Sequence, residues 1–169
     1  VVVRTSDGKS FVVTPKLLLA SSTNRGVAQL SDFIVTYLHG LVALSEEPSS
    51  LHVRSGDQRI CVAELQVSRG IPWARGPGWG APIWSGAVGR MLMAGETCQE
   101  LDEIFARNFM EPLTTNSIVE PAKIRSRIDQ ARLDGWSCSS SETVIGAAAV
   151  AAPLVTSGGR TIAVLSLYG

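Results

Sequence analysis

The sequence predicts an α+β domain in which a central antiparallel sheet is flanked by helices. Its last 35 residues, Gly135 to Gly169, divide into three strand-like segments separated by turn residues. The last two of these segments are predicted to pair as an antiparallel hairpin at the centre of the sheet. Upstream, apolar residues recur at three- and four-residue spacing in several segments, which is the pattern of amphipathic helices.

Length and composition bound the class of protein. The chain has 169 residues, enough for one domain with a little left over, and 45% of them are hydrophobic, as expected of a packed core. The formal net charge is zero, so the chain lacks the basic excess of a self-sufficient nucleic-acid binder. The longest apolar run, Val144 to Val155, has 12 residues and is too short to span a membrane. We see no signal peptide, and a first residue other than Met indicates a fragment of a longer protein.

The cysteines and histidines predict neither a metal site nor a disulfide framework. Cys61, Cys98 and Cys138 are odd in number and widely spaced, which fits a reducing cytoplasm. His39 and His52 are isolated, and an isolated histidine is more often a surface or satisfied core residue than a ligand. We expect no metal, cofactor or catalytic residue.

The N-terminal segments resemble the end of a unit that continues upstream. Val1–Arg4 and Ser10–Val13 are β-branched and flank an Asp-Gly turn signal, which predicts a hairpin. An isolated two-stranded hairpin is marginal in water. Thr14 and Pro15 then provide an N-cap and a first helical residue, so residues 14–24 are predicted to form a connecting helix.

A long amphipathic helix is predicted from Val27 to Leu44, with its apolar stripe ending before Pro48. The stripe comprises Leu30, Phe33, Ile34, Tyr37, Leu38 and Leu41. Leu51–Arg54 and Arg59–Leu65 are predicted to be two strands, because a Ser-Gly-Asp turn separates them.

The segment from Arg69 to Trp84 is dense in Gly, Pro and Trp. It carries Trp73, Trp79 and Trp84, whose large rings are costly to expose. The segment is therefore either a loop that folds over a pocket or a loop plugged into the core. Arg75 lies among these aromatics, where it either binds a carboxylate through its guanidinium fork or is simply solvated.

Three helices are predicted next. Pro82 is predicted to open the first, Ile83–Ala94, whose small residues in the first turns allow close approach to a sheet or leave N–H groups for an anion. The spacing there matches neither a Walker loop nor a Rossmann fingerprint. A capping box precedes the second helix, Cys98–Arg107. The third runs from Pro121 to Asp134 with a glycine C-cap, and its basic residues indicate a solvated outer face.

The C-terminal strands are predicted at Trp136–Glu142, Ile145–Val155 and Arg160–Tyr168, with a Thr-Ser-Gly-Gly turn before the last. The middle strand is unusually rich in alanine, and its small side chains leave room above the sheet. A closely docked helix or a small ligand would fill that room.

The ordered set of these segments resembles the IclR family of bacterial transcription regulators, over the whole chain. The residues that carry the resemblance follow in chain order: Gly78 to Ala94 with Pro82, Gly89 and Arg90; Gly135, Trp136 and Glu142; Ala151-Ala152-Pro153-Leu154; and Leu165 to Gly169.

The resemblance implies a domain organisation. Residues 1–13 would be the remnant of the wing hairpin of a winged helix-turn-helix domain, 14–24 the linker helix, and 25–169 the effector-binding domain, which is GAF-like or profilin-like in fold. The helix that reads base edges is not in this chain, so operator DNA would be bound only through the absent N-terminal domain. Members of the family are homodimers or tetramers in the cytoplasm and bind a small organic acid over the sheet.

The resemblance also implies which residues contact the effector, and it carries over only in part. The corresponding positions are Ala87, Val88, Ser139, Ala149, Ser166 and Tyr168. To these we add Trp73, Arg75 and Trp79 of the Trp-rich loop. The chain departs from the family pattern because Ser139 replaces an Asp, Ala149 a Cys and Tyr168 a Ser. Fewer charged groups and a Trp-rich loop favour a larger, aromatic acid; the alternative is that the tryptophans fill the core and the pocket is narrow.

Two other functional classes remain open. One is a dimerisation module without a ligand. The other is a cysteine-dependent hydrolase, for which Cys138 is the best candidate because it lies near Glu142 in a Ser-rich strand.

Overall fold

The computed structural model describes the backbone of residues 2–4, 11–13, 25–67 and 75–169, and the side chains within these ranges from residue 34 onward. The chain divides into two compact units, Val1–Thr36 and Tyr37–Gly169. In the first unit, β1 (Val2–Arg4) and β2 (Phe11–Val13) pair antiparallel, as the hairpin signal predicts. That this hairpin belongs to a wing stays a prediction, and the predicted linker helix lies outside the described residues.

Helix α2 spans Arg25–Ser45, close to the predicted bounds. Ile34 and Leu38, four residues apart, are buried members of the predicted stripe, whereas Tyr37 is exposed, contrary to its place in that stripe. The last turns of α2 are joined to the sheet, because the Ser49 hydroxyl donates a hydrogen bond to the Leu38 carbonyl. No described helix is long and apolar enough to cross a membrane.

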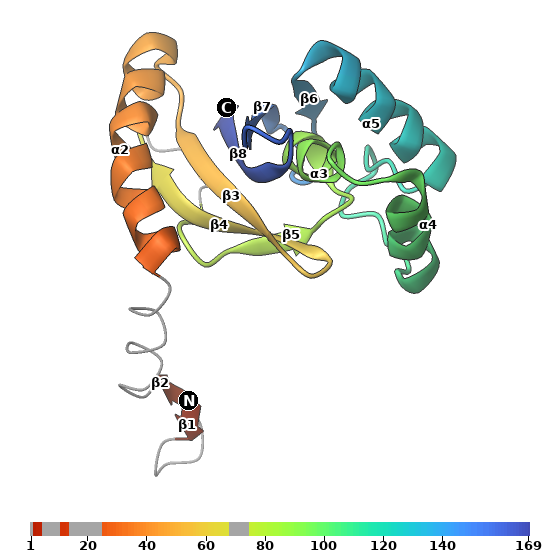
Figure 1. Ribbon diagram of the computed structural model, residues 1–169, viewed down its shortest axis with the longest axis horizontal. Helices are drawn as coiled ribbons and strands as arrows, with labels where there is room; N and C mark the ends of the chain where they lie inside the picture. The colour runs from red at the N-terminus through yellow and green to blue at the C-terminus, as the bar shows by residue number, and fades with distance from the viewer. Residues whose placement is uncertain (1, 5–10, 14–24, 68–74) are drawn as a thin grey trace. The chain divides into compact units, whose positions relative to one another are not determined.

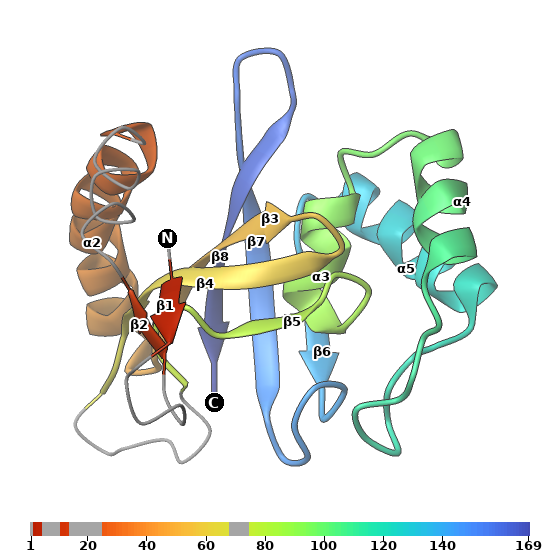
Figure 2. The same cartoon turned by 90° about the horizontal axis from the view of Figure 1, so that it is seen from below.

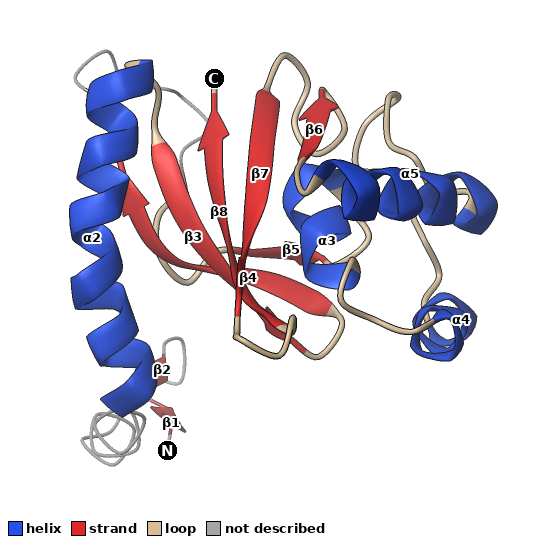
Figure 3. Cartoon of the chain, turned by 45° about the horizontal axis from the view of Figure 1, so that its top comes forward, coloured by secondary structure: helices blue, strands red, loops and turns tan. Residues whose placement is uncertain are grey.

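The second unit contains a six-stranded sheet in which every neighbouring pair is antiparallel. The strands lie in the order β5-β4-β3-β8-β7-β6, so the C-terminal strand lies near the middle with β7 beside it, as predicted (Figure 3). The strands are β3 (Ser49–Ser55), β4 (Gln58–Leu65), β5 (Gly80–Pro82), β6 (Ser137–Ser140), β7 (Ala148–Val155) and β8 (Thr161–Tyr168).

A β-bulge between β3 and β4 decides which side chains share a face. The register shifts between Leu51 and His52, so that His52 pairs with Cys61 while Ser50 pairs with Glu64. In a regular strand, Arg59 and Glu64 would point to opposite faces because their separation is odd. The extra residue of the bulge reverses this alternation and places both on the face that carries His52.

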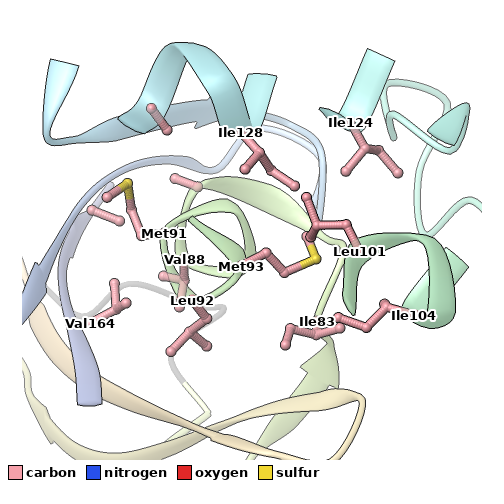
Figure 4. Close-up of a cluster of buried hydrophobic side chains, with 13 residues drawn as sticks. Ile83, Val88, Met91, Leu92, Met93, Leu101, Ile104, Ile124, Ile128 and Val164 are labelled. Atoms are coloured by element: carbon pink, nitrogen blue, oxygen red, sulfur yellow. The ribbon is translucent and has the colours of Figure 1, made fainter. Parts of the chain in front are cut away.

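Three helices, α3 (Gly86–Met93), α4 (Cys98–Arg107) and α5 (Pro121–Asp134), form a layer on one side of the sheet. Figures 1 and 2 show α3 between the sheet and the other two helices. All eight residues of α3 are buried, and its apolar side chains pack with those of α4 and α5, such as Leu101 and Ile128 (Figure 4). The core therefore lies around α3.

The sequence predicts α4 and α5 with their observed bounds. The Thr97 side chain and the Glu100 carboxylate form the expected capping box, and Gly135 ends α5 with φ 75°. The predicted start of α3 is wrong. Pro82 ends the edge strand β5, opposite Gln58, and the helix begins only at Gly86. A proline is compatible with both places, because neither an edge strand nor the first turn of a helix requires an N–H donor at that position.

Gly89 is required by close packing against the backbone before α3. A Cβ at this position would lie 1.9 Å from the Ile83 carbonyl oxygen, which belongs to the main chain and cannot rotate away. We expect Gly89→Ala to lower the free energy of unfolding by about 1–3 kcal/mol or more, since 1–3 kcal/mol is the usual cost of overpacking. Gly40→Ala in α2 is the control, because a Cβ there meets nothing within 4 Å. It should stabilise the chain by up to about 1 kcal/mol. Urea denaturation measures both, and equal effects would contradict the packing argument.

Candidate functional site

A cavity lies between the sheet and the start of α3. Together with the space at its open mouth it has a volume of about 630 Å³. Its wall is formed by β3, β4, β6, β7, β8, the first turn of α3, the loop before β5 and the loop after β6. Eight of the predicted site residues line it: Arg75, Trp79, Ala87, Val88, Ser139, Ala149, Ser166 and Tyr168. The ninth, Trp73, lies outside the described residues. The geometry brings these eight together; that they bind an effector stays a prediction.

The sequence left open whether the alanine-rich strand and the Trp-rich segment fill the core or line a pocket, and residues of both segments do each. In the alanine-rich strand, Ala151 is a buried member of the core cluster around α3, whereas Ala149 packs against that cluster and also lines the cavity. In the Trp-rich segment, Trp79 lines the cavity and Trp84 packs against the core. The small side chains of β7 thus accommodate both a docked helix and an open space.

Sequence reasoning missed three polar residues of the cavity wall: His52, Arg59 and Glu64. It also missed several small or apolar ones: Gly86, Thr143, Val144, Ala147 and Ala148. The sequence held one signal for Arg59. It occupies every second position of the strand with Cys61 and Ala63, so it is expected on the same buried face as Cys61. It held none for Glu64, because the bulge is not visible in the sequence.

A chain of hydrogen bonds joins three buried side chains on the cavity side of the sheet. The Ser50 Oγ lies 2.9 Å from the Ser166 Oγ and 3.0 Å from the His52 Nε2. Burial, and secondarily the charge of Arg59, lowers the pKa of His52 to about 3. The imidazole is therefore neutral near pH 7. Its Nε2 is engaged, and its Nδ1 has no hydrogen-bond partner among the described residues.

The predicted pH response of His52 is a loss of stability in acid. Its pKa in the folded state, about 3, lies below the unfolded value of 6.5, so the unfolded chain binds more protons between these values. Stability falls as the pH drops through 6.5, by about 2 kcal/mol between pH 8 and pH 5 from this group. Urea denaturation across that range measures the slope. His52→Asn should remove it, whereas the exposed His39→Asn should leave it; an unchanged slope in His52→Asn would refute the assignment.

Arg59 is a buried cation that forms no ion pair with any residue in the described part of the chain. Its residue surface is 6% exposed, and its guanidinium lies 5.1 Å from the centre of the Trp79 ring. Burial lowers its pKa to about 10, so it remains charged near pH 7. No side chain that the structure describes forms an ion pair or hydrogen bond with it. Burying an unpaired charge costs several kcal/mol, so this arrangement favours an anion that arrives from outside.

Two other charged residues line the cavity beside Arg59. Arg75 lies over the same Trp79 ring, 5.5 Å from its centre. The Glu64 carboxylate accepts hydrogen bonds from the Gly76 amide, at 3.2 Å, and from the Gln66 side chain. These contacts fix one carboxylate oxygen of Glu64 at the loop that leads to β5.

All three buried side-chain polar atoms that lack a hydrogen-bond partner, within the described part of the chain, belong to cavity-lining residues. They are the His52 Nδ1, the Arg59 Nε and the Tyr168 hydroxyl. Glu64 and Gln66 act on the pKa of Tyr168, but neither has hydrogen-bond geometry to its hydroxyl; burial and Glu64 raise that pKa, so the phenol is neutral. Most buried polar groups in folded proteins are paired, so this concentration indicates a polar ligand site.

A buried ion pair supports the cavity wall. Arg90 of α3 is 3% exposed and binds both oxygens of Glu142, at 2.7 and 3.1 Å. It also donates to the Ser137 hydroxyl at 2.9 Å and to the Cys138 carbonyl. Glu142 precedes the loop that carries Thr143 and other wall residues, so this pair ties α3 to β6 and to that loop.

The cysteines do not form a nucleophilic site at the cavity. Burial, with the nearby Glu64, raises the pKa of Cys61 to about 12, so this thiol is protonated near pH 7. Cys98 and Cys138 are exposed and are not part of the cavity wall in the described residues.

Residues 24–169 match the family described as "Bacterial transcriptional regulator IclR C-terminal". The Pca regulon regulatory protein of Pseudomonas putida is 24% identical over 164 residues, which are 96% of this chain and 56% of that protein. The chain thus spans about half the length of this curated relative.

Solved structures agree with the sequence match. A transcriptional regulator from Rhodococcus sp. RHA1, described as putative, superposes with a TM-score of 0.83 at 26% identity, covering 94% of this chain and 65% of that one. A double mutant of the inducer-binding domain of the PobR transcription factor from Acinetobacter, solved with 3-hydroxybenzoic acid, has a TM-score of 0.75 at 20% identity. That superposition covers 82% of each chain and shows a shared fold.

Proposed function

The chain belongs to the IclR family of bacterial transcriptional regulators, of which it carries the C-terminal domain, and on this premise we propose that its cavity binds a small organic acid. The observation that carries the proposal is Arg59, a buried guanidinium that forms no ion pair with a carboxylate of the described residues. A bound carboxylate would supply the missing charge through charge-assisted hydrogen bonds, which are among the strongest in proteins.

The start of α3, which also lines the cavity, gives further support. Its N-cap residue, Ser85, makes no side-chain cap and instead donates to the Pro82 carbonyl. The first amides of the helix, at Gly86, Ala87 and Val88, therefore have no side-chain acceptor at the N-cap. Helix N-termini favour anions because these N–H groups and the helix dipole point at them. A Cβ at Gly86 would lie 2.9 Å from the Thr143 hydroxyl, so the lack of a side chain at Gly86 leaves space between the start of α3 and Thr143.

In the whole protein, the acid would control DNA binding by a winged helix-turn-helix domain outside this chain. The acid would bind one arrangement of the oligomer more tightly than another, and this difference in affinity sets the size of the response, typically about 1–3 kcal/mol. Residues 14–24 would transmit the change as a linker helix. Because the spacing of DNA half-sites is strict, a small rotation of the homodimer or tetramer would alter operator binding.

A thermal-shift screen of the purified 169-residue chain against aliphatic and aromatic carboxylic acids tests the proposal. An acid at about 100 times its dissociation constant adds about 2.7 kcal/mol of stability. We expect a rise in melting temperature that Ser166→Leu abolishes, because Ser166 lies in the cavity wall and is 4% exposed.

The other outcomes have definite meanings. A rise that survives Ser166→Leu would keep the acid sensor and move its site elsewhere. No rise with any acid would overturn the proposal and leave the ligandless dimerisation module as the better description.

A further inference from the structure

Resting on the proposed acid site, we infer that the ligand is a monocarboxylate that carries a neutral hydroxyl group, and that Glu64 excludes dicarboxylates. The inference uses residues on the β3, β4 and β8 part of the cavity wall: His52, Arg59, Glu64 and Tyr168. These residues determine both how much negative charge the cavity accepts and what second group it holds.

The charges on the described residues of the wall leave room for one negative charge. Arg59 and Arg75 contribute two positive charges and Glu64 one negative charge, while His52 is neutral near pH 7. A monoanion neutralises this wall. The second carboxylate of a dianion would lie in the same cavity as Glu64, and like charges in a poorly solvated site repel strongly.

The two neutral orphan atoms favour a hydroxyl. The His52 Nδ1 donates or accepts according to the tautomer, since Nε2 is shared with Ser50, and the Tyr168 hydroxyl can do both. A ligand hydroxyl also donates and accepts, so it can satisfy either atom whichever tautomer is present. A ligand carboxylate only accepts and would add charge next to Glu64.

The bulge in β4 makes this combination possible. Ser50 pairs with Glu64 and His52 with Cys61, so the acid-binding cation and the excluding carboxylate of β4 share a face. The Glu64 carboxylate is held by the Gly76 amide and Gln66, which limits how far it can turn from a second anion.

The test uses isothermal titration calorimetry of the 169-residue chain with matched sets of acids on one skeleton. The sets are butyrate, 4-hydroxybutyrate and succinate, and benzoate, 3- or 4-hydroxybenzoate, and the phthalate isomer with its second carboxylate at the same ring position. Within the skeleton that binds, we expect the hydroxy acid to bind at least about fivefold more tightly than the unsubstituted acid, as one hydrogen bond provides. The dicarboxylate should bind more weakly than either.

Variants separate the two parts of the inference. Tyr168→Phe should reduce the preference for the hydroxy acid, measured as the ratio of its affinity to that of the unsubstituted acid. Glu64→Gln should raise the affinity for the dicarboxylate by tenfold or more, whereas Glu111→Gln, an exposed glutamate outside the cavity wall, should not.

The failures are distinguishable. If no acid of any set binds, the proposed function fails and this inference fails with it. If acids bind but the hydroxyl gives no advantage, or the dicarboxylate binds as well as the hydroxy acid to the unaltered chain, the acid site stands and this inference is overturned.

Discussion

Arg59→Met is expected to abolish acid binding while making the free chain more stable. The guanidinium is 6% exposed and lacks an anionic partner among the described residues, so its burial is a cost to the ligand-free fold. Methionine keeps much of the apolar stem over Trp79 and removes the charge. We expect the free energy of unfolding to rise by about 1–4 kcal/mol, and acid affinity to fall by about 30-fold or more, as when one partner of a buried charge pair is removed.

Calorimetric titration and urea denaturation measure the two effects on the same protein. Arg160→Met is the control, because Arg160 is exposed and lines a different hollow of the surface. It should change neither quantity appreciably. An Arg59→Met chain that is destabilised would show that the guanidinium has a structural partner, and one that binds acids normally would remove Arg59 from the site.

Arg90→Met is expected to lower the free energy of unfolding by about 3–5 kcal/mol, the usual result of removing one member of a buried ion pair. Glu142, whose side chain is 11% exposed, would lose its counter-charge, and the Ser137 hydroxyl and the Cys138 carbonyl would each lose a hydrogen bond. Because the loop after Glu142 carries part of the cavity wall, acid affinity should fall as well.

Two further variants test the reason for this loss in urea denaturation. The double change Arg90→Met with Glu142→Leu should recover much of the stability, since no charge is then left buried alone. Arg125→Met, which breaks the more exposed pair with Asp102, should cost no more than about 1 kcal/mol. Equal losses in Arg90→Met and Arg125→Met would contradict the burial argument.

Most of the helices and strands could be predicted because their signals are local. The capping box at Thr97 and Glu100 and the left-handed Gly135 specify where α4 and α5 begin and end from a few adjacent residues. The alternation of residues in β8 and the glycine turn before it likewise predicted the central hairpin. Pro82 was predicted wrongly as a helix start, because a residue without an N–H suits an edge strand equally well.

The site was predicted less completely than the fold. Most of the residues that were found came from the family resemblance, and those that were missed depend on tertiary contacts. Residues such as Ala87, Ser139 and Ser166 were assigned through the family resemblance, and the structure brings them around one cavity. His52 was predicted to be an isolated histidine. Nothing near it in the sequence points to Ser166, which lies 114 positions later and is linked to His52 through the Ser50 hydroxyl.

The sequence by itself determined the order and approximate extent of the elements, the family, and the small residues at the start of α3 and in β7. Only the tertiary structure decided the chemistry of the cavity. A one-residue bulge placed Glu64 on the face of Arg59. Folding left that arginine without an ion-pair partner among the described residues and paired Arg90 with Glu142, 52 residues away. Turns and caps depend on neighbours in the chain, whereas burial, strand register and charge pairing depend on which distant segments come together.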